Sequence, residues 1–167
     1  NSLGIKGESF GHVHYAIDYL ESPDSFNLGD NVAIIGMGNA AMDVARTALR
    51  KGATNVTLYA RRNTPSANAH EVQFASLDGA KFVYYKKPVE ITDNGILFED
   101  ITPNENEENS KIELIKADSV IISVSQGPKD RLVSTTKGLH ATDNGLLITN
   151  TRGYTTHDAI FAAGDVV

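Results

Sequence analysis

Cysteine is absent from this chain of 167 residues. Without it, the chain cannot form a disulfide, bind a metal through a thiolate or use a cysteine nucleophile. Long apolar runs are missing too, because none approaches the roughly 20 residues that a membrane-spanning helix needs. The first residues also lack the pattern of a signal peptide. We therefore expect a cytoplasmic protein that has no membrane partner.

Basic residues are in the minority, with 15 lysines and arginines against 21 aspartates and glutamates and a net charge of −6. Such a surface repels nucleic-acid phosphates, so we exclude nucleic acid as a partner. The five histidines include His12 and His14, but no pair has the spacing of a zinc site, so we expect no metal. The hydrophobic fraction of 41% is that of a folded globular protein.

The apolar pattern predicts a strand, a helix and a second strand early in the chain. Val32–Ile35 is a continuous apolar run, as in a strand buried on both faces of a parallel sheet. Apolar residues then recur three and four positions apart, which predicts a helix from just past Gly38 to about Lys51, with Gly52 at its C-terminal cap. Asn55–Tyr59 is the second strand.

The remaining elements predict an α/β fold: a Rossmann-like, doubly wound parallel sheet with flanking helices and an antiparallel β-meander insert. Asp93-Asn94-Gly95 is a strong hairpin signal within the meander, and residues 103–110 form a polar tip. We expect helices over His12–Leu20 and Asn68–Leu77, and strands over Phe82–Tyr85, Val89–Ile91, Ile96–Glu99, Ile112–Ile115, Ser119–Val124, Gly145–Thr149 and Ala159–Ala163.

The turn after the first strand has the G-x-G-x-x-A form of a dinucleotide-binding fingerprint, in the run Gly36–Ala41. Gly36 permits the tight turn, Gly38 leaves room for a pyrophosphate, and Ala41 lets the helix pack close to the strand. The free N–H groups at the start of the helix then face the phosphates. This strand–turn–helix–strand context favours a dinucleotide site over a purely structural turn.

The second strand ends in Tyr59-Ala60-Arg61-Arg62. Sites specific for NAD usually carry an acidic residue here, about 20 residues after the glycines, which bonds the ribose 2′-hydroxyl. Arginine instead matches a phosphate with two parallel hydrogen bonds, so Arg61 and Arg62 suit the 2′-phosphate of NADP. We therefore expect NADPH as the cofactor. The alternative is a pair of solvated surface arginines.

The run Gly36–Arg46, joined to Tyr59–Arg62, resembles the NADPH-binding domain of FAD-dependent pyridine nucleotide oxidoreductases. It is most similar to the small subunit of the NADPH-dependent glutamate synthase, and more distantly to the adrenodoxin reductase type. Three other regions resemble parts of this family, namely its lead-in segment, its strand near the nicotinamide and its second FAD-contact motif. They are Gly4–Glu8 with Ala16–Leu20, Ala117–Pro128, and Ile160–Val167.

The resemblance implies that NADPH passes a hydride to FAD, with the cofactors carrying the chemistry and no catalytic side chain in this chain. Asp165 would contact FAD only in the intact parent protein. The cofactor-binding residues that the resemblance and the motifs imply are Gly36, Gly38, Asn39, Ala40, Ala41, Arg61, Arg62, Ser125, Gln126, Gly164 and Asp165.

The chain starts at Asn1 and stops at Val167 directly after an apolar run, so we expect a fragment of a longer protein. Residues 1–30 would lead in from an FAD domain, residues 31–158 would bind NAD(P)H, and residues 159–167 would return to the FAD domain. Expected partners are the dinucleotide, that FAD domain, and a large synthase subunit or a ferredoxin-type protein.

The fragment alone should bind NADPH weakly, hold no FAD and turn nothing over. Two alternatives remain open at this point. One is a stand-alone regulatory module that senses NAD(P)H without redox turnover. The other places FAD, not NADPH, at the glycine turn, because both dinucleotides use this fingerprint.

Overall fold

The computed structural model describes residues 2–103, 111–124, 133, 135–142, 146–157, 159–164 and 167. Residues 2–125 form one compact unit, and residues 126–167 belong to a second. The helices and strands given below all lie in the first unit, which also contains the glycine turn and the arginine pair.

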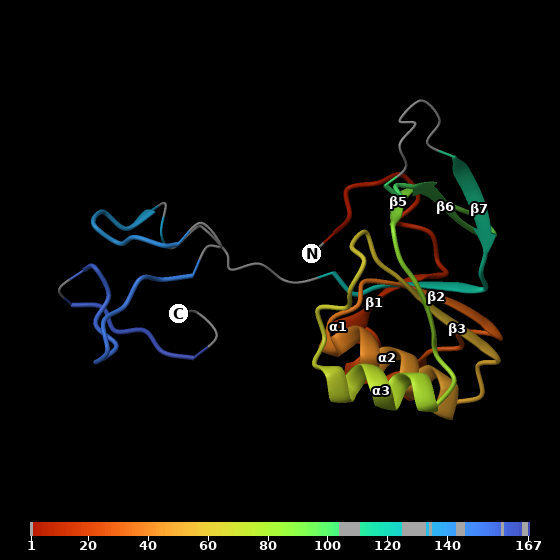
Figure 1. The fold of residues 1–167 in the computed structure, drawn as a ribbon, viewed down its shortest axis with the longest axis horizontal. Helices are drawn as coiled ribbons and strands as arrows, with labels where there is room; N and C mark the ends of the chain where they lie inside the picture. The colour runs from red at the N-terminus through yellow and green to blue at the C-terminus, as the bar shows by residue number, and fades with distance from the viewer. Residues whose placement is uncertain are drawn as a thin grey trace. The chain divides into compact units, whose positions relative to one another are not determined.

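A five-stranded parallel sheet forms the centre of the first unit, in the order β1-β8-β2-β3-β4 (Figure 1). The chain moves outward from β2 through β3 and β4, and then returns to β8 on the other side of β2. Open α/β sheets bind ligands beyond the carboxyl ends of their strands at such a reversal. The strands are β1 (Val13–Tyr15), β2 (Asn31–Ile35), β3 (Asn55–Tyr59), β4 (Lys81–Val83) and β8 (Ser119–Ile122).

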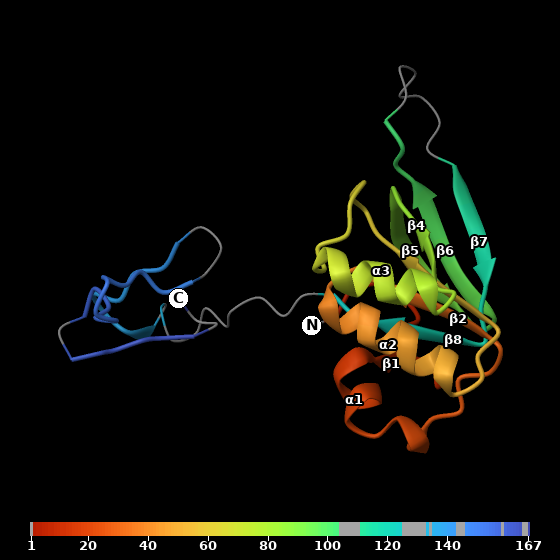
Figure 2. The same cartoon turned by 60° about the horizontal axis from the view of Figure 1, so that its bottom comes forward.

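Three helices cover one face of this sheet, with α2 lying between α1 and α3 (Figure 2). They are α1 (Ala16–Glu21), α2 (Asn39–Arg50) and α3 (Ala69–Leu77), and a short 3-10 turn, η1 (Pro23–Ser25), follows α1. Because side chains alternate along a strand, Ile34 and Leu58 point toward the helices and pack against the buried stripe of α2.

An antiparallel sheet covers the opposite face, where a doubly wound fold would carry more helices (Figure 1). Its strands are β5 (Lys86–Thr92), β6 (Gly95–Asp100) and β7 (Ile112–Lys116), in that order. Ile35, Tyr59 and Ile122 of the parallel sheet share a buried cluster with Ile96 and Phe98 of the antiparallel sheet. The rings of Tyr59 and Phe98 stack at 4.4 Å between centroids and join the two sheets.

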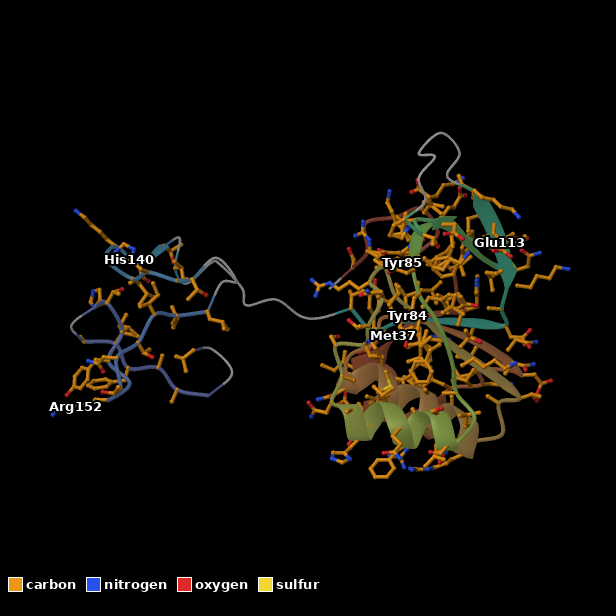
Figure 3. All side chains as sticks on the ribbon, in the orientation of Figure 1. Met37, Tyr84, Tyr85, Glu113, His140 and Arg152 are labelled. Atoms are coloured by element: carbon orange, nitrogen blue, oxygen red, sulfur yellow. The ribbon has the colours of Figure 1, made fainter. Side chains whose placement is uncertain are left out.

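The expected fold class is confirmed, but several element boundaries differ from the sequence prediction, and two of these differences have a clear physical reason. Val13–Tyr15 is a strand, because it pairs in parallel with β8, so the helix expected from His12 begins only at Ala16. The strand expected over Phe82–Tyr85 ends at Val83. Tyr85 has a φ of 57°, which no strand residue adopts, and it turns the chain from the parallel into the antiparallel sheet (Figure 3).

The two strands expected late in the chain are not regular strands within the described residues. Leu147, Thr149 and Phe161 each form an isolated bridge instead. A local turn competes with longer pairing, because the side-chain oxygen of Asn150 accepts hydrogen bonds from the N–H groups of Arg152 and Tyr154. Most of the expected polar tip, residues 104–110, lies outside the described residues.

The stacked pair between the sheets gives a stability prediction. Phe98 is fully buried, so Phe98→Ala should lower the free energy of unfolding by about 3–5 kcal/mol. Leu77→Ala, which truncates a side chain that is 75% exposed, should change it by less than about 0.5 kcal/mol. Urea unfolding measures both variants. Equal effects would show that Phe98 does not hold the sheets together.

Candidate functional site

A cleft of about 470 Å³ opens at the carboxyl ends of β2, β3 and β8. Gly36, Met37 and Gly38 lie along it, and Arg61 and Arg62 also line it. The glycine turn and the arginine pair, which are separated in the sequence, therefore border one space. This is the arrangement that the dinucleotide fingerprint requires.

Gly36 is required by the fold itself. Its φ is +122°, a value that residues other than glycine rarely adopt. A Cβ there would lie 2.2 Å from the carbonyl oxygen of Ser123. Its N–H donates to the carbonyl of Tyr59 at 2.9 Å. The turn after β2 is thus held between the ends of β8 and β3, with no room for a side chain.

Gly38 differs, because nothing in the described part of the chain requires a glycine there. Its φ of −85° and ψ of −179° are extended values open to any residue. A Cβ would meet only the hydroxyl of Ser66, at an ordinary contact distance of 3.6 Å. The missing side chain instead leaves backbone accessible beside the cleft. A ligand that approaches this backbone closely explains the glycine, as a pyrophosphate does.

The start of α2 supplies hydrogen-bond donors at the same place. The N–H of Met42 donates to the carbonyl of Gly38, which opens the helical ladder, so the N–H groups of Asn39, Ala40 and Ala41 come before it. No side chain caps this end. Free amides and the positive end of the helix dipole attract a phosphate group.

The arginine pair is exposed, and within the described part of the chain neither Arg61 nor Arg62 forms an ion pair. The two lysines of the cleft are paired. Lys86 lies 3.1 Å from Asp100 and 3.4 Å from Glu113, and Lys87 lies 2.8 Å from Glu99. The charges left for an anionic ligand are therefore those of the two guanidinium groups.

Lys86 does not lose its ion-pair partners through a change of protonation near neutral pH. Burial lowers the pKa of Lys86, but hydrogen bonds and charge from Asp100 and Glu113 outweigh this effect and raise it overall. Hydrogen bonds from Thr102 and then from Lys86 lower the pKa of Asp100 to about 2. Both groups stay charged at neutral pH, so this ion pair is a fixed part of the wall.

The lead-in segment forms part of the cleft, which the motifs did not predict. Leu3 and Ile5 line it, and the segment is held because the N–H of Ile91 donates to the carbonyl of Lys6 at 2.8 Å. Gly7 lies so close to this strand that a Cβ would be 1.9 Å from the carbonyl oxygen of Ile91. One sequence signal could have indicated that this segment packs against the domain, namely the alternation of apolar Leu3 and Ile5 with exposed Gly4 and Lys6.

The structure thus brings together most of the expected site. Gly36, Gly38, Arg61 and Arg62 line the cleft, Asn39 and Ala40 are exposed at the start of α2, and Ala41 is fully buried under it. Ser125, Gln126 and Asp165 lie outside the described residues. Gly164 belongs to the second unit, where it is exposed with a φ of +79°.

The described ranges contain neither a metal-binding cluster nor a membrane-spanning helix. No group of three or more histidine, aspartate or glutamate side chains is close enough there to hold a metal ion. No helix in those ranges combines the length and the apolar character needed to cross a bilayer.

The profile of the pyridine nucleotide-disulphide oxidoreductase family matches residues 1–167. The chain belongs to this family. Among curated relatives, it is 30% identical to the glutamate synthase [NADPH] small chain of Halomonas elongata, over 98% of the chain and 42% of that protein. It is also 30% identical to the NAD-dependent dihydropyrimidine dehydrogenase subunit PreT of Salmonella typhimurium, over 96% of the chain and 38% of that protein.

This member of the family therefore spans less than half of the length of these relatives. Among solved structures, thioredoxin reductase of T. acidophilum superposes with a TM-score of 0.80 at 24% identity, over 99% of the chain and 54% of that structure. The bacillithiol disulfide reductase Bdr of Bacillus cereus gives 0.72 at 20% identity, over 98% and 49%. At these identities the likeness establishes the fold, and the expected family resemblance is confirmed by the profile.

The two glycines of the turn should respond differently to alanine. Gly36→Ala forces a side chain into a left-handed conformation and against Ser123, so we expect it to lower the free energy of unfolding by at least about 1–3 kcal/mol. Gly38→Ala should cost no more than about 1 kcal/mol, the difference between glycine and alanine as a helix N-cap. Denaturant unfolding of both variants measures this, and equal losses would contradict the division of roles.

Proposed function

We propose that this chain is the NADPH-binding domain of a flavin-dependent oxidoreductase of the glutamate synthase small-subunit type, and that its parent passes a hydride from NADPH to FAD. Its membership of a family of pyridine nucleotide oxidoreductases supports the class of reaction. The observation that carries the cofactor assignment is that two guanidinium groups, which form no ion pair within the described residues, line the same cleft as the glycine turn that leads into the uncapped start of α2.

In this proposal each part of NADPH would meet a different group of residues. The pyrophosphate would lie against Gly38 and the free N–H groups of Asn39 and Ala40. The 2′-phosphate of the adenosine would face Arg61 and Arg62. The nicotinamide would extend the other way, toward the carboxyl end of β8 and on to Ser125 and Gln126, as the family resemblance implies. The protein then contributes binding and orientation, while the cofactors supply the hydride chemistry.

Family membership does not choose between NADPH and NADH, because one relative is named for NADPH and another for NAD. The choice depends on the group that meets the ribose 2′ position. A carboxylate accepts a hydrogen bond from a 2′-hydroxyl and repels a phosphate, whereas a guanidinium binds the phosphate. Arg61 and Arg62 directly follow β3, where we expect the ribose 2′ group, and no carboxylate pairs with them within the described residues. They favour NADPH.

The flavin would belong to the parent protein. We propose that residues 1–30 and 159–167 connect this domain to an FAD domain of the same chain, and that Gly164 and Asp165 contact FAD there. A large synthase subunit or a ferredoxin-type protein would take the electrons onward.

Removing both guanidinium groups tests the cofactor assignment. The wild-type chain should bind NADPH more tightly than NADH, and Arg61→Ala/Arg62→Ala should remove about 1–3 kcal/mol of that preference, the size of a charge-assisted hydrogen bond. NADH affinity should change little. Fluorescence titration with each reduced cofactor measures the four dissociation constants.

A double variant matched for net charge serves as the control. Arg50 and Lys81 are exposed and do not line the cleft, so Arg50→Ala/Lys81→Ala should leave the NADPH preference unchanged. If this variant loses as much of the NADPH preference, the effect of the arginines is explained by net charge alone. Tight binding of FAD by the wild-type chain, with no affinity for NADPH, would assign the glycine turn to FAD instead.

The isolated chain should bind NADPH without oxidising it, because the hydride acceptor belongs to the parent. Absorbance at the nicotinamide band should stay constant when the purified chain and NADPH are mixed in air. As a positive control, adding an unrelated flavoprotein that oxidises NADPH should make the absorbance fall. Oxidation by the chain alone would contradict the division of labour between the two domains.

A further inference from the structure

The arginine pair stands on a segment, Arg61–Asn68, that contains neither helix nor strand (yellow in Figure 1). Its start is fixed by β-type bonds at Ala60, whose N–H donates to the carbonyl of Val83 at 3.0 Å and whose carbonyl accepts from the N–H of Lys86 at 2.9 Å. The carbonyl of Arg62 also accepts from the N–H of Tyr85, at 3.4 Å. The end of the segment has no strand to pair with, so the course of the chain beyond Arg62 depends on what holds that end.

Three hydrogen bonds hold the end of the segment, and all of them run to the glycine turn. The N–H groups of Ser66 and Ala67 donate to the carbonyl of Met37, at 3.0 and 2.9 Å. The N–H of Asn68 donates to the side-chain oxygen Oδ1 of Asn39 at 2.9 Å. Met37 is itself fixed, because its side chain is buried in the core under α2 (Figure 3).

Asn39 contributes the side chain in this set, whereas the other two bonds are between backbone groups. It is the first residue of α2, and Asn68 directly precedes α3, so its amide joins the starts of two helices. As the N-cap residue of α3, Asn68 has an N–H group for which the helix provides no acceptor. The bond therefore satisfies this donor and at the same time fixes the far end of the arginine segment.

The hydrogen bond between Asn68 and Asn39 should affect the choice between NADPH and NADH, and not dinucleotide binding in general. Arg61 and Arg62 are exposed and unpaired within the described residues, so no ion pair holds them in place. If the segment loosens, a 2′-phosphate must order it on binding, and that ordering reduces affinity. NADH has no 2′-phosphate and gains nothing from the ordered segment.

We propose that Asn39 is a positioning residue for cofactor specificity: its Oδ1 atom anchors the segment Arg61–Asn68 to the phosphate-binding turn, and the preference for NADPH over NADH depends on this anchor. This inference rests on the function proposed above. It assigns to Asn39 a role on the 2′-phosphate through the arginines, in addition to its place beside the pyrophosphate.

Asn39→Ala in the full 167-residue chain tests the anchor. The ratio of the dissociation constants for NADH and NADPH should fall on the order of tenfold, the equivalent of one ordinary hydrogen bond, because NADPH binding weakens by about tenfold more than NADH binding does. Circular dichroism and thermal melts confirm that the variant folds. An unchanged ratio in a folded Asn39→Ala chain would overturn the proposal.

Asn39→Asp separates the anchor from a direct contact with the cofactor. Aspartate keeps an oxygen that accepts from the Asn68 N–H, but it places a negative charge beside the pyrophosphate. We expect it to weaken NADPH and NADH by the same factor and so to keep the ratio. A ratio that falls as far as in Asn39→Ala would show that acceptance at Oδ1 is not what matters.

The same bond can be removed from its other side. Asn68 has a φ of −60°, which proline adopts, so Asn68→Pro deletes the donor N–H without forcing a new φ. Its ratio should fall as in Asn39→Ala, and the two changes combined should cost no more than either alone. Asn68→Ala keeps the N–H and is the matched control. Additive losses would overturn a shared anchor.

The wild-type measurement separates the two proposals. If the wild-type chain shows no preference for NADPH, the proposed cofactor fails and the role of Asn39 fails with it. A second outcome is that the wild-type chain prefers NADPH, that Arg61→Ala/Arg62→Ala abolishes this preference, and that Asn39→Ala leaves it unchanged. In that case the cofactor assignment stands and only the anchor is wrong.

Discussion

The site depends on one close approach between backbone segments, that of the turn after β2 to the end of β8. Gly36 reaches so near the carbonyl of Ser123 that a Cβ would lie 2.2 Å from it, and the N–H of Ser123 donates to the carbonyl of Ile35 at 2.8 Å. With the turn fixed there, α2 starts at the reversal point of the sheet, directly after Gly38, which lines the cleft. The same turn then accepts the end of the arginine segment through Met37 and Asn39.

Much of this arrangement could be predicted from the sequence, because the signals are local. The run Val32–Ile35, the glycines and the apolar stripe of α2 each specify a conformation within a few residues, and β2, the turn and α2 followed as expected. The position of Arg61 and Arg62 could be predicted as well. Parallel strands end at one edge of a sheet, so residues directly after β3 must lie near residues directly after β2.

Features that depend on distant pairing could not be predicted. Val13–Tyr15 has the apolar spacing of a helix end, and only its pairing with Val120–Ile122 makes it a strand. The wall formed by Leu3 and Ile5 depends on a bond between Lys6 and Ile91, which lie 85 positions apart in the sequence. Nothing local to Asn39 indicates that it meets Asn68. A loop without periodicity gives no signal for its partners.

The two glycines show how the fold and the cofactor constrain different atoms of one motif. Gly36 is determined by backbone contacts inside the chain, so any member with this turn needs it, whatever dinucleotide it binds. Gly38, which is half-buried, and the exposed arginine pair line the cleft, and the backbone conformation of Gly38 is open to other residues. A high structural likeness to reductases named for different substrates therefore establishes the fold and leaves cofactor preference to be argued from the site itself. On the function proposed above, a few charges on an exposed segment would decide cofactor preference, which would then depend on how firmly that segment is held. The side chain of Asn39, at the start of α2, connects the turn that any dinucleotide would need with the segment that would distinguish one dinucleotide from another.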